Sequence, residues 1–203
     1  MSEGEGRRCL IVTAHPLAES LCMHLADHAE ARARAAGWEV EQLDLYRAGF
    51  VPALTAAERA STYAAKYDSS AVSAEIAMLL RAEAIILVFP TWWFGLPATL
   101  MGGIRRVWAP GIAQKRGGIP RRRRGELKRL RHLLAITTIG APAWLDFLTM
   151  RRPLQIFFLK GCLVSFCEPQ ARFGYLALHS AENVSGDRLA SFQAAVDRAI
   201  ERL

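Results

Sequence analysis

The sequence has few cysteines, and their spacing fits none of the usual cysteine-based sites. Cys9, Cys22, Cys162 and Cys167 are the four cysteines among 203 residues, and no two of them form a CxxC pair. A disulfide framework or a thiolate metal site requires a denser or closer arrangement. Residues 1–8 also lack the apolar stretch of a secretory signal. We therefore expect the protein in the reducing cytoplasm.

Glycine-rich phosphate-binding motifs are absent as well. The sequence contains neither the GxGxxG fingerprint of dinucleotide-binding proteins nor a P-loop with its lysine. No internal repeat is visible. Any phosphate-binding site in this chain must therefore use another arrangement of donors, such as the N-terminus of a helix.

Excess positive charge is missing from most of the chain, although the net charge is +7. Residues 114–131 hold nine basic residues and one acidic residue, a local charge of +8, which leaves −1 for the rest. This segment, including Arg121–Arg124, lacks aromatic residues, so stacking on single-stranded nucleic acid is disfavoured. A solvated loop, recognition of the phosphates of a nicotinamide cofactor, and contact with an anionic surface remain open.

Charged residues are also absent from residues 84–104, a stretch long enough to suggest a membrane span. Pro90, Gly95, Pro97, Gly102 and Gly103 interrupt it, however. The pattern favours a buried strand, a turn and a helix, with no membrane span.

Short apolar runs alternate with helical stretches along the chain. The expected strands are 9–13, 38–43, 84–89, 132–138 and 162–166, and the expected helices are 20–36, 56 to about 67, 71–81, 98–108, 153–159 and 184–203. This alternation predicts an α/β fold with a parallel sheet covered by helices on both faces. The length and the apolar fraction of 52% indicate a single domain over residues 1–203.

Ligands of such sheets bind beyond the carboxyl ends of the strands, so the loops at those ends are candidate site segments. The first loop follows Thr13, contains His15, and leads through Ser20 into a helix. The N–H groups and dipole of a helix N-terminus favour an anion such as phosphate. The alternative is that Ser20 only caps the helix and His15 packs in a turn.

Two further loops follow later strands. One carries Pro90, Thr91, Trp92, Trp93 and Phe94, which suit the wall of a pocket for a flat ring system, or alternatively fill a core or an interface. The other carries Thr137, Thr138, Ile139 and Gly140, whose hydroxyl and amide groups suit the edge of a ring, or form an ordinary turn.

Together these segments resemble the NAD(P)H:quinone oxidoreductase family of flavodoxin-like proteins. The matching segments are 14–16 with Ser20, 44–46, 89–90 with 93–98, 105–107, and 137–138 with Gly140. The resemblance implies a three-layer flavodoxin-like fold whose five-stranded parallel sheet has the order 2-1-3-4-5. It also implies a homodimer that passes reducing equivalents from NAD(P)H, by a ping-pong reaction, through non-covalently bound FMN or FAD to a quinone-like acceptor. The short chain favours FMN slightly.

The resemblance also assigns residues to the flavin site. It places the phosphates and ribityl chain beside His15, Ser20, Leu21 and Cys22, and the isoalloxazine between Pro90, Thr91, Trp92, Trp93, Phe94 and the loop residues Thr137, Thr138, Ile139, Gly140. Cys22 stands where better-known members have Asn, and Ile139 where they have Gly. The Tyr and His that follow this last loop in family members are replaced by Trp144, Leu145 and Asp146, so we assign no catalytic acid or base.

Three other readings compete with a quinone reductase. A flavodoxin-like regulatory subunit with low turnover would use segment 114–131 to dock on a partner, and nucleic-acid association would use the same arginines. His24 and His28 lie four residues apart on the first expected helix, which is a metal-ligand spacing. Because no further ligand cluster accompanies them, we expect no metal site.

Overall fold

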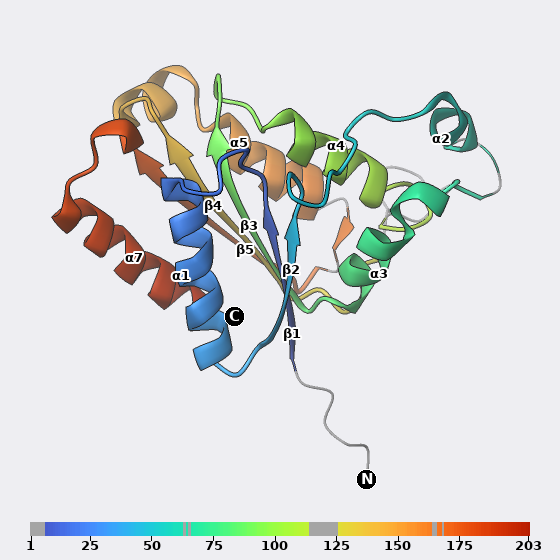
Figure 1. Ribbon diagram of the computed structural model, residues 1–203, viewed down its shortest axis with the longest axis horizontal. Helices are drawn as coiled ribbons and strands as arrows, with labels where there is room; N and C mark the ends of the chain where they lie inside the picture. The colour runs from blue at the N-terminus through green and yellow to red at the C-terminus, as the bar shows by residue number, and fades with distance from the viewer. Residues whose placement is uncertain (1–6, 63, 65, 114–125, 164–165, 168) are drawn as a thin grey trace, which may run out of the picture.

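The computed structural model describes residues 7–62, 64, 66–113, 126–163, 166–167 and 169–203. Most of the basic segment, including Arg121–Arg124, lies outside the described residues. Five parallel strands form one sheet: β1 (Arg8–Thr13), β2 (Glu39–Asp44), β3 (Ala84–Thr91), β4 (His132–Ile139) and β5 (Arg172–His179). Their order is β2-β1-β3-β4-β5, which confirms the predicted topology (Figure 1).

Helices cover both faces of the sheet (Figure 1). One face packs against α1 (Leu21–Ala35) and α7 (Gly186–Ile200), and the other against α3 (Ser73–Arg81), α4 (Ala98–Val107) and α5 (Pro153–Ile156). Shorter elements are α2 (Ala56–Ser61), the turns η1 (Ser70–Val72) and η5 (Ala181–Asn183), and the π-type turns η3 (Leu145–Thr149) and η4 (Phe157–Leu163). The fold therefore has the three layers that the sequence predicts.

Strand β3 lies at the centre of the sheet, between β1 and β4. Every one of its eight residues is buried, because a parallel strand with helices on both faces has no solvent side. The uncharged stretch 84–104 is therefore β3, the following turn and the start of α4. Among the described helices, none combines the length and apolar character needed to cross a bilayer.

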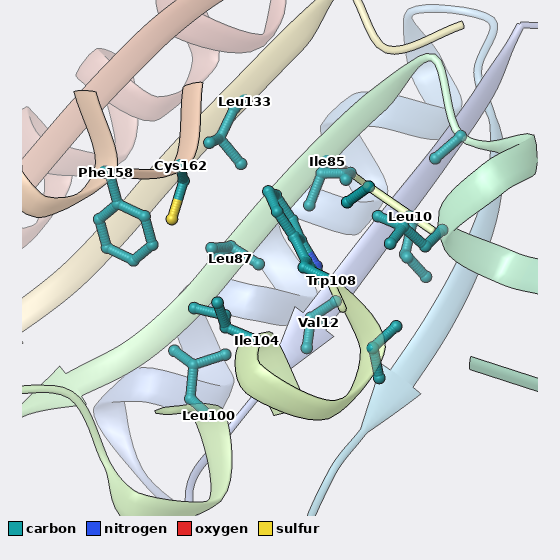
Figure 2. Packing of buried hydrophobic residues seen from close by; sticks show 14 of the residues in the cluster. Leu10, Val12, Ile85, Leu87, Leu100, Ile104, Trp108, Leu133, Phe158 and Cys162 are labelled. Atoms are coloured by element: carbon teal, nitrogen blue, oxygen red, sulfur yellow. The ribbon is translucent and has the colours of Figure 1, made fainter. Parts of the chain in front are cut away.

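The larger core cluster lies between the sheet and α3, α4 and α5. Figure 2 shows Leu10, Val12, Ile85 and Leu87 of the strands facing Leu100, Ile104 and Trp108 of the α4 segment, with Phe158 and Cys162 farther along the same face. The second cluster joins the opposite face to α1 and α7. Burial on both sides fixes the register of the strands, because a one-residue slip would turn every side chain to the wrong face.

The predicted fifth strand at 162–166 is wrong. Chain residues 157–163 form the π-type segment η4, and the fifth strand is β5 at Arg172–His179. Leu154, Phe158 and Cys162 are four residues apart and all buried, which is the spacing of one helical face. Strand β5 escaped notice because it is an edge strand whose residues are mostly half-buried, so it lacks a continuous apolar run.

A buried ion pair attaches α2 to α4. The Glu58 carboxylate, in the first turn of α2, accepts a hydrogen bond of 2.9 Å from Arg106 Nε, and both residues are almost fully buried. The Arg106 guanidinium also donates to the backbone carbonyl of Val51. Burial alone would raise the pKa of the Glu58 carboxyl, but bonds from Arg106 and the Thr55 amide, with the Arg106 charge, hold that pKa below its usual value.

We predict that Arg106→Met lowers the free energy of unfolding by about 3–5 kcal/mol, because it leaves the Glu58 carboxylate buried without its cation. Urea unfolding followed by circular dichroism measures this loss. Arg105→Met is the matched control, since Arg105 is exposed on the same helix, and we expect it to change stability by under about 0.5 kcal/mol. Equal losses in the two variants would contradict a role for the ion pair.

Candidate functional site

A cavity of about 720 Å³ opens at the carboxyl edge of the sheet. The loops after β1, β3, β4 and β5 surround it, because parallel strands end at the same edge (Figure 1). Every site residue predicted from the sequence lines it except Thr137: His15, Ser20, Leu21, Cys22, Pro90, Thr91, Trp92, Trp93, Phe94, Thr138, Ile139 and Gly140. Segments far apart in sequence thus meet around one space.

The N-terminus of α1 forms one wall of this cavity. Ser20 is its N-cap, and the Ser20 hydroxyl accepts a hydrogen bond from the Met23 amide at 3.2 Å. The His24 amide bonds to the Ser20 carbonyl. The amides of Leu21 and Cys22 lie before the first intrahelical bond and have no partner among the described hydrogen bonds, so they can bind an anion together with the helix dipole.

The loop before α1 orients the ring of His15. Its Nδ1 lies 3.1 Å from the Leu17 amide nitrogen, which donates to it, and the same Nδ1 is 3.1 Å from the Leu17 carbonyl oxygen. When Nδ1 accepts from the Leu17 amide, the ring proton resides on Nε2. His15 then presents a second kind of donor at the end of the cavity that holds the helix N-terminus.

Cys22 faces the same end of the cavity but stays uncharged. Burial, with a smaller contribution from the Asp44 charge, raises the pKa of the Cys22 thiol to about 12. The thiol is therefore protonated at neutral pH, and it neither repels an anion nor acts as a nucleophile. The predicted replacement of an asparagine by Cys22 leaves this wall of the cavity electrically neutral.

The aromatic loop after β3 is a tight, strained turn. The Trp92 and Gly95 backbones bond to each other in both directions, at 3.2 and 2.9 Å, and enclose Trp93 and Phe94. Both enclosed residues have positive φ, 51° and 55°, which costs a bulky side chain about 1–3 kcal/mol each. The turn leaves the Trp93 side chain 99% exposed, while the Trp92 ring lies 6.2 Å from that of His15.

The ends of β3 and β4 are joined by a pair of hydroxyl groups. Thr91 and Thr137 lie side by side across these strands, and their Oγ1 atoms are 2.7 Å apart. Thr137 is fully buried, so it does not line the cavity as predicted. Its hydroxyl instead holds Thr91, which does line the cavity, in place.

The structure adds Ala141, Ala181 and Glu182 to the cavity wall. Ala181 and Glu182 follow β5, and the misplaced fifth strand hid this loop from the sequence analysis. With β5 at its true position, the rule that ligands bind beyond the carboxyl ends of strands selects this loop too.

The residues that replace the family's Tyr and His form a separate contact. Asp146 is buried, and its carboxylate lies 3.0 Å from His179 Nε2 at the end of β5, beside the Phe147 ring. Neither Asp146 nor His179 lines the cavity. This pair attaches the loop after β4 to β5.

The predicted absence of a metal site concerned His24 and His28. His24 contacts Gln193 at 3.1 Å, and His28 contacts Asp197 at 2.8 Å, so both connect α1 to α7. In the described part of the chain, no three His, Cys, Asp or Glu residues gather as metal ligands would.

With this sheet order and this cavity on the page, the family is clear. The family described as having a flavodoxin-like fold matches residues 7–201, and the chain belongs to it. The solved NAD(P)H:quinone oxidoreductase from Methanothermobacter marburgensis superimposes with a TM-score of 0.82 at 21% identity, covering 97% of this chain and 96% of that one. An FMN-dependent NADH-azoreductase from Bacillus anthracis gives 0.71 at 16% identity, over 97% and 98% of the two chains.

Two relatives are more similar in sequence. The NAD(P)H oxidoreductase YcaK of Escherichia coli K12 is 37% identical over 110 residues, 54% of this chain and 56% of YcaK. The rat NAD(P)H dehydrogenase [quinone] 1 is 29% identical over 187 residues, 81% of this chain and 68% of the rat protein. The match thus spans little more than half the length of YcaK.

We predict that Thr137→Val lowers the free energy of unfolding by about 1–3 kcal/mol, because it leaves the Thr91 hydroxyl without its partner. Chemical unfolding measures the loss. The double variant Thr91→Val/Thr137→Val should recover most of it, since neither hydroxyl is then unpaired. Thr138→Val is the control, and an additive double variant would contradict the pairing.

Proposed function

We propose that this protein is a flavin-dependent oxidoreductase that passes hydride equivalents from NAD(P)H to a quinone-like acceptor. One observation carries the proposal: the anion-binding end of α1 and the aromatic turn after β3 border the same cavity. That cavity lies at the β1/β3 switch of a 2-1-3-4-5 sheet, which is where FMN binds in flavodoxin-like folds. The names of YcaK and of the rat relative supply the nicotinamide cofactor and, for the rat protein, the quinone.

The described residues fit a flavin with one phosphate. The Leu21 and Cys22 amides, with His15, would bind the phosphate, and Trp92, Phe94 and Ile139 would contact the ring system. When bound, the flavin supplies the hydride-accepting chemistry. We favour FMN over FAD because the cavity presents a single helix N-terminus and because none of the described lining residues is Lys or Arg.

The chain's own contribution is positioning. The strained Trp93–Phe94 turn and the Thr91–Thr137 pair fix the wall against which a planar ligand rests. His15 is the lining residue that can donate or release a proton near neutral pH. Four buried free cysteines agree with a reducing cytoplasmic location.

We predict that the purified protein binds FMN with 1:1 stoichiometry and is yellow. Under anaerobic conditions NAD(P)H should bleach the flavin absorbance near its visible maximum, and a quinone should restore it. Chromatography of the extracted cofactor separates FMN from FAD. A protein that binds neither flavin would refute the proposal, and flavin binding without quinone turnover would favour the regulatory subunit.

We also propose that the protein is a homodimer. Large apolar side chains are exposed on the segments η3 to η4, next to the cavity: Trp144, Phe147, Leu148, Met150, Ile156 and Leu159. A group of this kind on one surface is typical of an interface. Because the 99%-exposed Trp93 borders the same cavity, a second subunit there would cover it and narrow access to the acceptor site.

We predict that Leu148→Glu converts the dimer to a monomer, because Leu148 is the most exposed of these apolar residues, at 77%. Sedimentation velocity at several protein concentrations measures the change. Leu80→Glu, an exposed leucine on α3, is the control and should leave the dimer intact. A monomeric wild-type protein, or a dimeric Leu148→Glu variant, would contradict the assigned surface.

A further inference from the structure

The loop after β5 places an unpaired carboxylate in the cavity wall. Glu182 lies on η5 and lines the cavity with its neighbour Ala181. Its Oε1 would lie 3.0 Å from a Cβ added to Gly140, so the carboxylate rests against the loop after β4. The backbone leading into this loop is strained, since Ser180 has a φ of 48°.

No described cation neutralises this carboxylate. The nearest arginine in sequence, Arg188, donates instead to the backbone carbonyl of His179 at 2.7 Å. Among the described residues that line the cavity, Glu182 is the one with a negative charge at neutral pH, and no Lys or Arg is present. An ionised carboxylate is an acceptor only, so its partner must carry O–H or N–H groups.

The cavity therefore has two chemically distinct kinds of contact. The N-terminus of α1 offers donors to an anion, whereas Glu182 offers an acceptor and repels anions. A flavin has both kinds of partner group, since its phosphate is an anion and its ribityl hydroxyls and ring N–H are donors. A ligand bound in one orientation would satisfy both contacts.

We propose that Glu182 is a flavin-binding residue whose carboxylate accepts hydrogen bonds from hydroxyl or ring N–H groups that FMN and FAD share. This inference rests on the proposed function and deepens it. Glu182 also sets the ease of reduction, because reduction by two electrons with uptake of one proton adds a negative charge to the flavin. A nearby carboxylate disfavours that charge.

The affinity test compares wild type with Glu182→Ala by flavin fluorescence quenching, using FMN and FAD. A hydrogen bond to a partly exposed charged group is worth about a factor of ten in affinity, so we expect Kd to rise about tenfold for both flavins. Lumiflavin, which has the ring but no ribityl chain, separates the donors: it loses affinity in the variant only if Glu182 contacts the ring N–H.

The redox test uses Glu182→Gln, which keeps the size of the side chain and removes its charge. We expect the midpoint potential of the bound flavin to rise, and a tenfold change in the ratio of affinities for reduced and oxidised flavin corresponds to about 30 mV for two electrons. Asp187→Asn is the matched control, because Asp187 is an exposed carboxylate on α7 that does not line the cavity. It should leave both affinity and potential close to wild type.

The outcomes separate this inference from the proposed function. A wild-type protein that binds neither FMN nor FAD overturns both. Normal wild-type binding with unchanged or tighter binding by Glu182→Ala overturns the role of Glu182 alone, as does a loss confined to FAD or an unchanged potential in Glu182→Gln. Shifts of equal size in Asp187→Asn would assign the effect to general charge, and would also overturn it.

Discussion

The parallel pairing of β3 between β1 and β4 is the constraint on which the rest of the structure depends. Because all three strands run in the same direction, the residues that follow them meet at one edge. Helices on both faces bury β3 completely, so the strand can shift neither along nor across the sheet without exposing apolar surface. The loops after Thr13, Thr91 and Ile139 are thereby held around one cavity.

Much of this arrangement could be predicted from the sequence, because strongly apolar parallel strands have a clear pattern. The expected strands at 9–13, 38–43, 84–89 and 132–138 each lie within two residues of β1 to β4. Strand β5 was missed because Gly174 and Ala177 dilute an edge strand that packs on few neighbours. The apolar residues around Cys162 looked like a strand because their four-residue spacing is obscured by the apolar residues between them.

The same difference explains which site residues the sequence could reveal. His15, Ser20, Trp92 and Gly140 belong to loops adjoining strands with a clear pattern, so chain order alone brought them together. Glu182 depends on the position of β5, and an isolated glutamate carries no pattern of its own. The burial of Thr137 could not be predicted either, since the alternation of faces at the end of β4 is set by its pairing with β3 and β5.

The backbone strain of the aromatic turn argues that this wall serves a ligand rather than the fold. Trp93 and Phe94 hold positive φ values that glycine would adopt without cost, and Trp93 buries no surface within the chain in return. A turn selected only for stability would use smaller residues there. Aromatic rings kept at such a cost, beside an anion-binding helix end and an unpaired carboxylate, are therefore best explained by contacts with a planar, partly anionic molecule and with a second subunit.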